Sequence, residues 1–296
     1  MLRGRGVRSL GIDVGVRKGL DVVLLDDRLD LLDDRLELLA LHRHVELGSL
    51  GALIDDLRPD VVAIDAPPAW GTTGGSRRTE AALRALGIQS YGTPSDPKKA
   101  DNPFYDWMRV GFKVFEIAAS RHFHRYATGD VLHAAIEVFP HASAVVLAGS
   151  LPPSGIPKRE WRMEVLEKAG VVGDKLRSAD QVDAALAALT GLLAANGEFV
   201  APGDPDEGVI VLPVRSLPEK AFGRPFPKAR AGSQAHLPGL IPCACGDPGC
   251  SGMTAREFTP GHDAKRKSIL WRLAREGERA AGELKERGWD LPPEMR

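Results

Sequence analysis

The sequence has few cysteines and no long uninterrupted apolar run. Only 3 of its 296 residues are cysteines, an odd number that cannot close into pairs, which argues against a disulfide framework. The apolar stretch around 131–146 is broken by His, Glu and Pro before the ~20 residues that a membrane helix needs. The basic N-terminus lacks the apolar segment and cleavage site of a signal peptide. We therefore expect a globular cytoplasmic protein with no membrane contact.

An excess of charge of one sign is also lacking. The chain has 39 Lys and Arg against 40 Asp and Glu, a formal net charge of −1. No chain-wide positive field therefore attracts nucleic acid, and such binding would depend on local basic patches. With 43% hydrophobic residues, the chain can bury one sizeable core and a smaller appendage. The sequence leaves the oligomeric state open.

The first 65 residues contain the pattern of a mixed sheet. Apolar residues alternate from Arg8 to Val14, and two further apolar runs cover 20–25 and end near His42, which predicts an antiparallel meander. The sequence Leu-Leu-Asp-Asp-Arg-Leu occurs twice, seven residues apart, and also suits a helix. A helix ending at Leu57 and an apolar strand over 61–64 then predict a parallel pairing through a crossover.

The remainder of the chain predicts an α/β fold with a tail. Residues 71–103, rich in Gly, Pro and Ser, predict an exposed loop with a short helix. Helices are expected over 104–126, 159–169 and 180–196, the last capped by Ser178, and strands over 132–138, which stops at Pro140, and 209–212. We divide the chain into a domain over 1–214, a Pro-, Gly- and Lys/Arg-rich linker over 215–241 and a tail over 242–296.

Two aspartates end strands that we expect to be neighbours. Asp13 lies in the segment Gly11-Ile12-Asp13-Val14-Gly15, whose glycines allow the backbone to approach a phosphate. Asp65 ends the strand at 61–64, and ligands collect at the carboxyl ends of strands in open α/β sheets. Both positions also suit ordinary turns in which the carboxylate accepts backbone N–H groups. The glycine segment also fits the phosphate loop of actin-like ATPases and sugar kinases.

Three further acidic residues fit the same site. Glu137 interrupts an apolar strand, where an unpartnered buried carboxylate costs several kcal/mol, so it either binds a metal or points to water from the strand edge. Asp180 and Asp183 are three residues apart near a helix start and share a face. Their alternative role is that of ordinary acids favoured by the helix dipole.

Several converging carboxylates would repel one another unless cations lay between them. Mg²⁺ and Mn²⁺ prefer such oxygen ligands, and two ions about 3.5–4 Å apart can activate a water and stabilise a departing oxygen. The acidic set therefore predicts hydrolysis of phosphodiester bonds, with nucleic acid as the expected partner.

These residues resemble the DUF429 family, whose members are regarded as nucleases of the ribonuclease H-like superfamily. The resemblance rests on the segments 11–15, 63–68, 77–88, 137–140 and 180–184, in that order, within about the first 215 residues. The Asp183-Ala184 helix is also similar to the last acidic helix of RuvC-type resolvases, which supplies metal ligands. The resemblance implies a ribonuclease H-like mixed sheet flanked by helices, and a metal-dependent nuclease.

The segment containing Arg77, Arg78 and Glu80 resembles a family segment with an arginine followed by a glutamate. Either arginine can be the matching residue. Beside a metal site an arginine can grip a phosphate oxygen, so we predict that these three residues bind substrate. The alternative is a surface arginine beside a helical glutamate.

The tail contains a possible zinc site. Cys243, Cys245, Cys250 and His262 offer three thiolates and an imidazole, enough for a tetrahedral structural Zn²⁺ site, although Asp263 or His236 are alternative fourth ligands. The alternative is unliganded thiols. A charged helix after 265 either contacts phosphates or is a solvated face.

Three hypotheses follow from the sequence. The first is an Mg²⁺- or Mn²⁺-dependent nuclease with Asp13, Asp65, Glu137, Asp180 and Asp183 at its centre. The second is an actin-like ATP-dependent phosphotransferase, based on the segment 11–15. The third is a non-catalytic module that binds nucleic acid or protein through its tail and linker.

Overall fold

The computed structural model describes residues 6–27, 36–95, 102–223, 240–241 and 253–254. The chain divides into two units, Met1–Lys228 and Ala229–Arg296. In the described part of the second unit, β9 (Leu240–Ile241) pairs antiparallel with β10 (Met253–Thr254). The expected zinc ligands Cys243, Cys245, Cys250 and His262 lie outside the described residues, so zinc binding stays a prediction.

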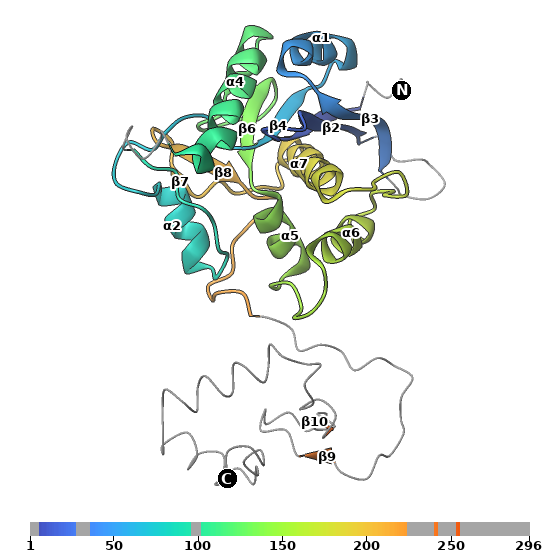
Figure 1. Ribbon diagram of the computed structural model, residues 1–296, viewed down its shortest axis with the longest axis vertical. Coiled ribbons are helices and arrows are strands. Elements are labelled where there is room, and N and C mark those ends of the chain that lie inside the picture. Colours follow the sequence, from blue (N-terminus) through green and yellow to red (C-terminus); the bar gives the residue numbers. More distant parts are fainter. Residues whose placement is uncertain (1–5, 28–35, 96–101, 224–239, 242–252, 255–296) are drawn as a thin grey trace. The chain divides into compact units, whose positions relative to one another are not determined.

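A mixed sheet of eight strands forms the centre of the first unit (Figure 1). Its order is β3-β2-β1-β4-β6-β8-β7, and β5 pairs with β6. The predicted antiparallel meander of β1, β2 and β3 is confirmed, as is the parallel pairing of β1 with β4. Strands β6 and β8 continue the parallel part. The strands are β1 (Arg8–Asp13), β2 (Leu20–Asp26), β3 (Glu37–Val45), β4 (Val61–Asp65), β5 (His124–Arg125), β6 (Ala134–Val138), β7 (Gly203–Asp204) and β8 (Gly208–Val211).

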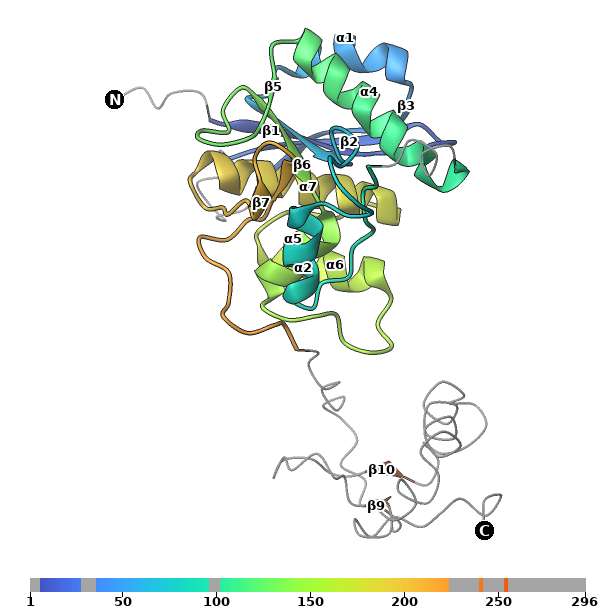
Figure 2. The same ribbon diagram turned by 90° about the vertical axis from the view of Figure 1, so that its left-hand side faces the viewer.

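Helices cover both faces of the sheet, so the expected mixed sheet flanked by helices is confirmed. Figure 2 shows α1 and α4 over one face and α5, α6 and α7 over the other. Each face buries its own apolar cluster. Among the described helices, none is long and apolar enough to cross a membrane. The helices are α1 (Leu47–Leu57), α2 (Arg78–Ala85), η1 (Pro103–Tyr105), α4 (Asp106–Ser120), α5 (Pro140–Ala148), α6 (Lys158–Lys168) and α7 (Ala179–Ala195).

Helix α5 follows β6 directly, where the sequence predicted only the end of a strand. Pro140 stands at the first turn of α5, a position that lacks an intrahelical partner for an N–H and therefore accepts proline. The apolar residues after it are buried against α7. The apolar stretch around 131–146 is thus a buried strand followed by a buried helix.

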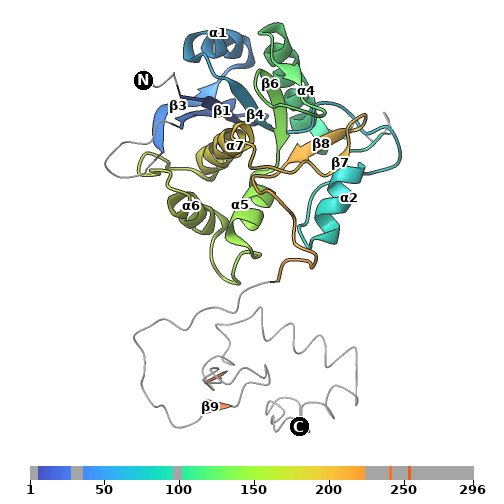
Figure 3. The same ribbon diagram turned by 180° about the vertical axis from the view of Figure 1, so that it is seen from behind.

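Helix α7 lies unusually close to β1, as Figure 3 shows from behind. A Cβ atom at Gly11 would lie 2.0 Å from the carbonyl oxygen of Ala184, and one at Gly191 would lie 2.1 Å from the Oγ of Ser9. Both glycines are therefore needed for the helix to pack on the strand. Gly11 serves helix packing here, whereas the sequence suggested the approach of a phosphate. The close packing brings the first turns of α7 beside the end of β1.

Candidate metal centre

Three aspartates stand in register across the middle of the sheet. Asp13 ends β1 and is the register partner of Asp21 on β2 and of Asp65 on β4. Residues directly opposite one another on neighbouring strands point to the same face. The strand pairing alone therefore places three carboxylates side by side where these three neighbouring strands begin or end.

Helix α7 brings two more aspartates to these strand ends. The Ser178 side chain accepts a hydrogen bond from the Gln181 backbone N–H at 3.1 Å, and the Gln181 side chain accepts one from the Ser178 backbone N–H at 3.3 Å. This reciprocal cap confirms the predicted helix start and fixes its first turn. Asp180 and Asp183 follow three residues apart and so share a face.

The five aspartates form two groups of three that share Asp13. One carboxylate oxygen each of Asp13, Asp65 and Asp183 lie within 4.8 Å of one another. The same holds for Asp13, Asp21 and Asp180. The structure thus brings together four of the five predicted metal-site residues and adds Asp21.

Burial and mutual repulsion disfavour the ionised state of these carboxylates. Burial, reinforced by the charges of Asp183, Asp180 and Asp21, raises the pKa of Asp13 to about 8. Burial and the neighbouring Asp13 and Asp183 also raise the pKa of Asp65 well above its ordinary value. A cation placed among these groups would remove the repulsion and favour the ionised forms.

The ionised form of Asp21 is also disfavoured by burial. Burial raises its pKa, although His44 partly opposes the shift. Its Oδ1 atom is buried and has no hydrogen-bond partner among the residues that the structure describes. A buried, unsatisfied carboxylate oxygen carries a free-energy penalty that a bound cation would remove. The donor set, carboxylate oxygens only, is the one that Mg²⁺ and Mn²⁺ prefer.

Two cationic side chains already contact the α7 aspartates. Arg162 on α6 donates from its Nη1 to both carboxylate oxygens of Asp183. Lys18, in the turn between β1 and β2, has its Nζ 3.7 Å from an oxygen of Asp180. The Arg162–Asp183 pair is largely buried, whereas the Lys18 side chain is exposed. Burial nevertheless leaves the pKa of Asp183 raised, despite the opposing effect of Arg162.

Glu137 lies outside both three-aspartate groups, in a buried ion pair with Arg77. The Arg77 guanidinium donates to the two Glu137 oxygens at 2.7 and 2.6 Å. It also donates to Glu80 at 3.0 Å, and Thr93 donates to Glu80 from its backbone N–H and hydroxyl. The sequence assigned a metal to Glu137 because a buried carboxylate needs a partner. In the structure that partner is an arginine from a distant loop.

Of the three residues expected to bind substrate, Arg77 and Glu80 are buried and Arg78 is exposed. Arg77 is 1% exposed and is enclosed by Glu80 and Glu137, so its guanidinium presents no open face to a phosphate. Glu80 accepts hydrogen bonds from the Arg77 and Thr93 backbones as well and anchors the start of α2. Arg78 is exposed and pairs with Asp204 at 2.9 Å. Substrate contact by these residues stays a prediction.

Sequence reasoning missed Asp21 and Arg162. Asp21 interrupts the apolar run of β2 in the way that Glu137 interrupts β6, so the same argument could have found it. The antiparallel meander, once expected, also places the start of the second strand opposite the end of the first. Arg162 carries no such signal, because only the packing of α6 against α7 brings it to Asp183.

The comparisons with known proteins give a family and no further relative. No curated protein and no solved structure matches the chain. Residues 11–207 match the family described as "Protein of unknown function (DUF429)". The matched region is more than half of the chain and contains all five aspartates and the Arg77–Glu137 pair. The chain therefore belongs to the DUF429 family.

Proposed function

We propose that this protein is a divalent-metal-dependent nuclease with a ribonuclease H-like fold. The observation that carries the proposal is the pair of three-aspartate groups that share Asp13. Two sets of three carboxylates that share one aspartate suit two cations held close together, as two-metal phosphoryl-transfer sites require. The mixed sheet flanked by helices on both faces agrees with the fold that the family resemblance implies.

Each aspartate has a position in this proposal. Asp13 would ligate both cations, with Asp65 and Asp183 completing one site and Asp21 and Asp180 the other. When bound, the cations would polarise the phosphate and lower the pKa of an attacking water. The protein's own contribution is to hold five carboxylates on three strand ends and one helix, so that little reorganisation is needed.

Cationic side chains beside the aspartates support a phosphate-containing substrate. Lys18 lies beside Asp180, and the positive charge of Lys158, at the start of α6, lowers the pKa of Asp183. Lys18 is exposed and ends in a strongly hydrated ammonium that can approach a phosphate oxygen. These residues supply the local positive charge that the nearly neutral chain lacks overall.

A chain of aromatic rings supports single-stranded nucleic acid as the substrate. Tyr91 and Phe104 are 67% and 48% exposed, and their ring centroids are 5.2 Å apart. Phe104 contacts Tyr105, which contacts Trp70, and Trp70 follows Asp65 by five residues. Exposed aromatic rings are suited to stack with unpaired bases.

The actin-like alternative loses the feature that suggested it. Its motivation was that Gly11 and Gly15 could let the backbone approach a phosphate. Gly11 packs against α7, and a Cβ atom at Gly15 would lie 2.4 Å from the carbonyl oxygen of Gly19. Both glycines are therefore explained by contacts within the protein.

The proposal is tested by incubating the purified full-length chain and Mn²⁺ with single- and double-stranded DNA and RNA. We expect cleavage, strongest on single strands, and its loss by at least 100-fold in Asp13→Asn and Asp65→Asn. The matched control is Asp56→Asn, which changes an exposed aspartate of α1. Absence of cleavage, or equal cleavage by Asp13→Asn and the unmodified protein, contradicts the proposal. ATP hydrolysis without nucleic-acid cleavage would support the actin-like alternative instead.

A further inference from the structure

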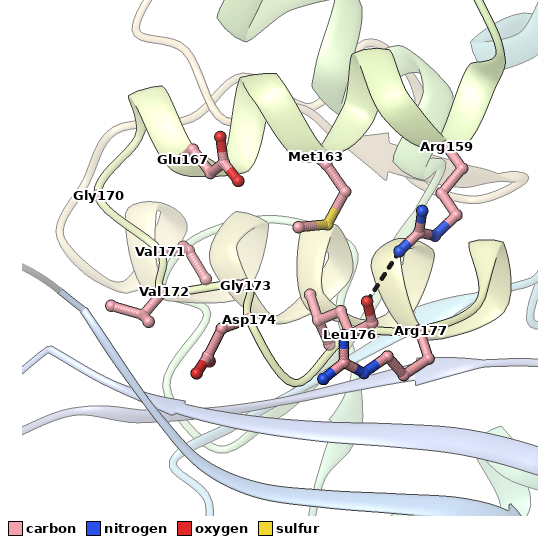
Figure 4. Close-up of a pocket in the computed structure, with 10 residues that line it drawn as sticks. All are labelled: Arg159, Met163, Glu167, Gly170, Val171, Val172, Gly173, Asp174, Leu176 and Arg177. Carbon is pink, nitrogen blue, oxygen red and sulfur yellow. Dashed lines mark hydrogen bonds between the residues drawn. The ribbon is translucent and has the colours of Figure 1, made fainter.

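A cavity of about 520 Å³ lies beside α6, outside the aspartate groups. Helix α6 forms one wall, and the segment 170–177, which connects α6 to α7, forms the other (Figure 4). Its floor is apolar, with Met163 from α6 and Leu176 from the connecting segment. Ligand pockets commonly enclose roughly 300–1,000 Å³ and combine an apolar lining with a few polar groups. This cavity falls within that range of volume and combines apolar side chains with charged side chains at its ends.

One end of the cavity is cationic. Figure 4 shows Arg159 and Arg177 together at this end. Among the described residues, Arg159 donates one hydrogen bond, from Nη2 to the Leu176 carbonyl oxygen at 3.0 Å, while its Nε is buried and has no partner there. The Arg177 side chain is exposed and makes no hydrogen bond or ion pair within the described part of the chain. Two guanidinium groups with unused donors suit a phosphate.

The opposite end of the cavity is acidic. Glu167 and Asp174 lie there, separated from the two arginines by Met163 (Figure 4). Both carboxylates are exposed, and neither pairs with a cation among the described residues. Because the two ends have opposite charge, the matching ligand has an anionic group at one end and N–H donors at the other.

The cationic end is the end nearer the aspartates. Arg159 precedes Arg162 by one helical turn on α6, and Arg162 contacts Asp183. Arg177 directly precedes Ser178, the cap of α7, and lies three residues before Asp180. A ligand whose anion lies between the two arginines would therefore have that anion at the end of the cavity from which α6 and α7 lead to the candidate metal centre.

We propose that this cavity binds one nucleotide unit, with its phosphate between Arg159 and Arg177 and an amino-bearing base near Glu167 and Asp174. The sugar and base would cover Met163 and Leu176. As part of a nucleic acid, this unit would be the nucleotide next to the hydrolysed bond, an assignment that rests on the proposed function. A free amino acid has the same two kinds of group but is too small to span a cavity of this volume.

The base end should discriminate among nucleotides. Guanine presents an N1–H and an amino group to a carboxylate, so one carboxylate can accept two hydrogen bonds from it. Adenine and cytosine present an amino group, whereas uracil has none. GMP should therefore bind most tightly and UMP most weakly.

The experiment measures the binding of GMP, AMP, CMP and UMP to the full-length chain by calorimetry in EDTA, so that no metal is involved. We expect GMP to bind at least threefold more tightly than UMP and Arg177→Ala to weaken GMP binding about tenfold. Glu167→Gln should reduce the preference for GMP over UMP while leaving UMP binding unchanged. The control is Lys168→Ala, since Lys168 is also on α6 but pairs with Glu164 outside the cavity.

Two results would overturn the proposal: no binding of any nucleotide, or equal GMP binding by Arg177→Ala and the unmodified protein. Because Arg177 is exposed, its replacement is not expected to unfold the chain, and thermal melting checks this. The measurement also separates this proposal from the proposed function. Nucleotide binding by an unmodified protein that cleaves no nucleic acid would retain the cavity assignment alone, whereas cleavage without any nucleotide binding in EDTA would retain only the nuclease.

Discussion

Arg162 on α6 donates hydrogen bonds to both carboxylate oxygens of Asp183 on α7. This contact places one positive charge beside the three-aspartate group of Asp13, Asp65 and Asp183. Arg162 lowers the pKa of all three aspartates, opposing the larger effect of burial. Arg162 therefore does in part what a bound cation would do fully, and it would compete with a cation for Asp183.

The first prediction concerns Arg162→Gln. In EDTA the variant loses the only cation in contact with Asp183 among the described residues, so the aspartates repel one another more and the melting temperature falls by several degrees. In saturating Mn²⁺ the metal replaces this charge, and the fall should be at least halved. Thermal melting in both buffers measures the difference. An equal fall in both buffers would show that Arg162 has a purely structural role.

The second prediction uses the pKa of Asp13. The folded, metal-free protein keeps this proton up to about pH 8, whereas the unfolded chain releases it near 3.8. The folded state therefore binds more protons between these values, and its stability falls as the pH rises from about 4 to 8. Asp13→Asn removes the part of this dependence that Asp13 contributes. In EDTA, the variant should exceed the unmodified protein in melting temperature by ~3 °C or more at pH 8, and by less at pH 5.

The same variant should behave in the opposite way with metal. In Mn²⁺ at pH 8 the unmodified protein gains stability from ligand binding, whereas Asp13→Asn, which has lost the shared ligand, does not. The order of the two melting temperatures is therefore reversed. If Asp13→Asn is the less stable protein in EDTA as well, repulsion does not dominate this site.

The third prediction concerns Asp21, the aspartate found from the structure. Asp21→Asn keeps the size of the side chain but weakens the group of Asp13, Asp21 and Asp180, leaving the other group intact. Calorimetric titration should show two Mn²⁺ ions per chain in the unmodified protein and one in the variant. Two ions in both proteins would place the second ion elsewhere.

The sequence was sufficient to predict most of the sheet, because the apolar periodicities of its strands are clear and turn or helix signals separate them. It also predicted Asp13, Asp65 and Asp183 as neighbours, since strand ends and helix starts can be placed from local signals such as Ser178. It assigned the wrong task to Gly11, because a glycine required for helix packing has the same local sequence as one required for a ligand. Only the packing of α7 distinguishes the two.

The partner of Glu137 could not be predicted for a related reason. The sequence correctly indicated that a buried carboxylate on this strand needs a partner. A metal ion and an arginine from a distant loop satisfy that need equally well, and the separation of 60 residues between Arg77 and Glu137 hides the pairing. Pairing across long loops is a property of the folded chain.

The fourth prediction concerns this pair. Arg77→Ala leaves the buried carboxylates of Glu80 and Glu137 without their cation and should lower the free energy of unfolding by ~3–5 kcal/mol. Adding Glu137→Gln to this variant should recover ~1 kcal/mol or more, because one uncompensated charge is removed. Urea unfolding in EDTA measures the unmodified protein, Arg77→Ala, Glu137→Gln and the double variant. Arg78→Ala, which removes an exposed arginine next to it, is the control and should change stability by less than ~0.5 kcal/mol. If the effects of Arg77→Ala and Glu137→Gln on the free energy of unfolding simply add in the double variant, the result would argue against the ion pair.

The fifth prediction concerns the exposed ring of Tyr91. Loss of a stacking ring typically weakens single-strand binding by ~1–3 kcal/mol, so Tyr91→Ala should raise the Kd for single-stranded DNA about tenfold. Tyr91→Phe keeps the ring and should bind almost normally, which separates stacking from the hydroxyl group. Binding is measured by fluorescence anisotropy in Ca²⁺, an oxygen-seeking cation chosen to limit cleavage. Since the Tyr91 ring contacts Phe104 but is 67% exposed, the variant should fold normally. Unchanged binding by Tyr91→Ala would exclude these rings from the nucleic-acid surface without affecting the metal centre, because the aspartates and the rings are tested by separate measurements.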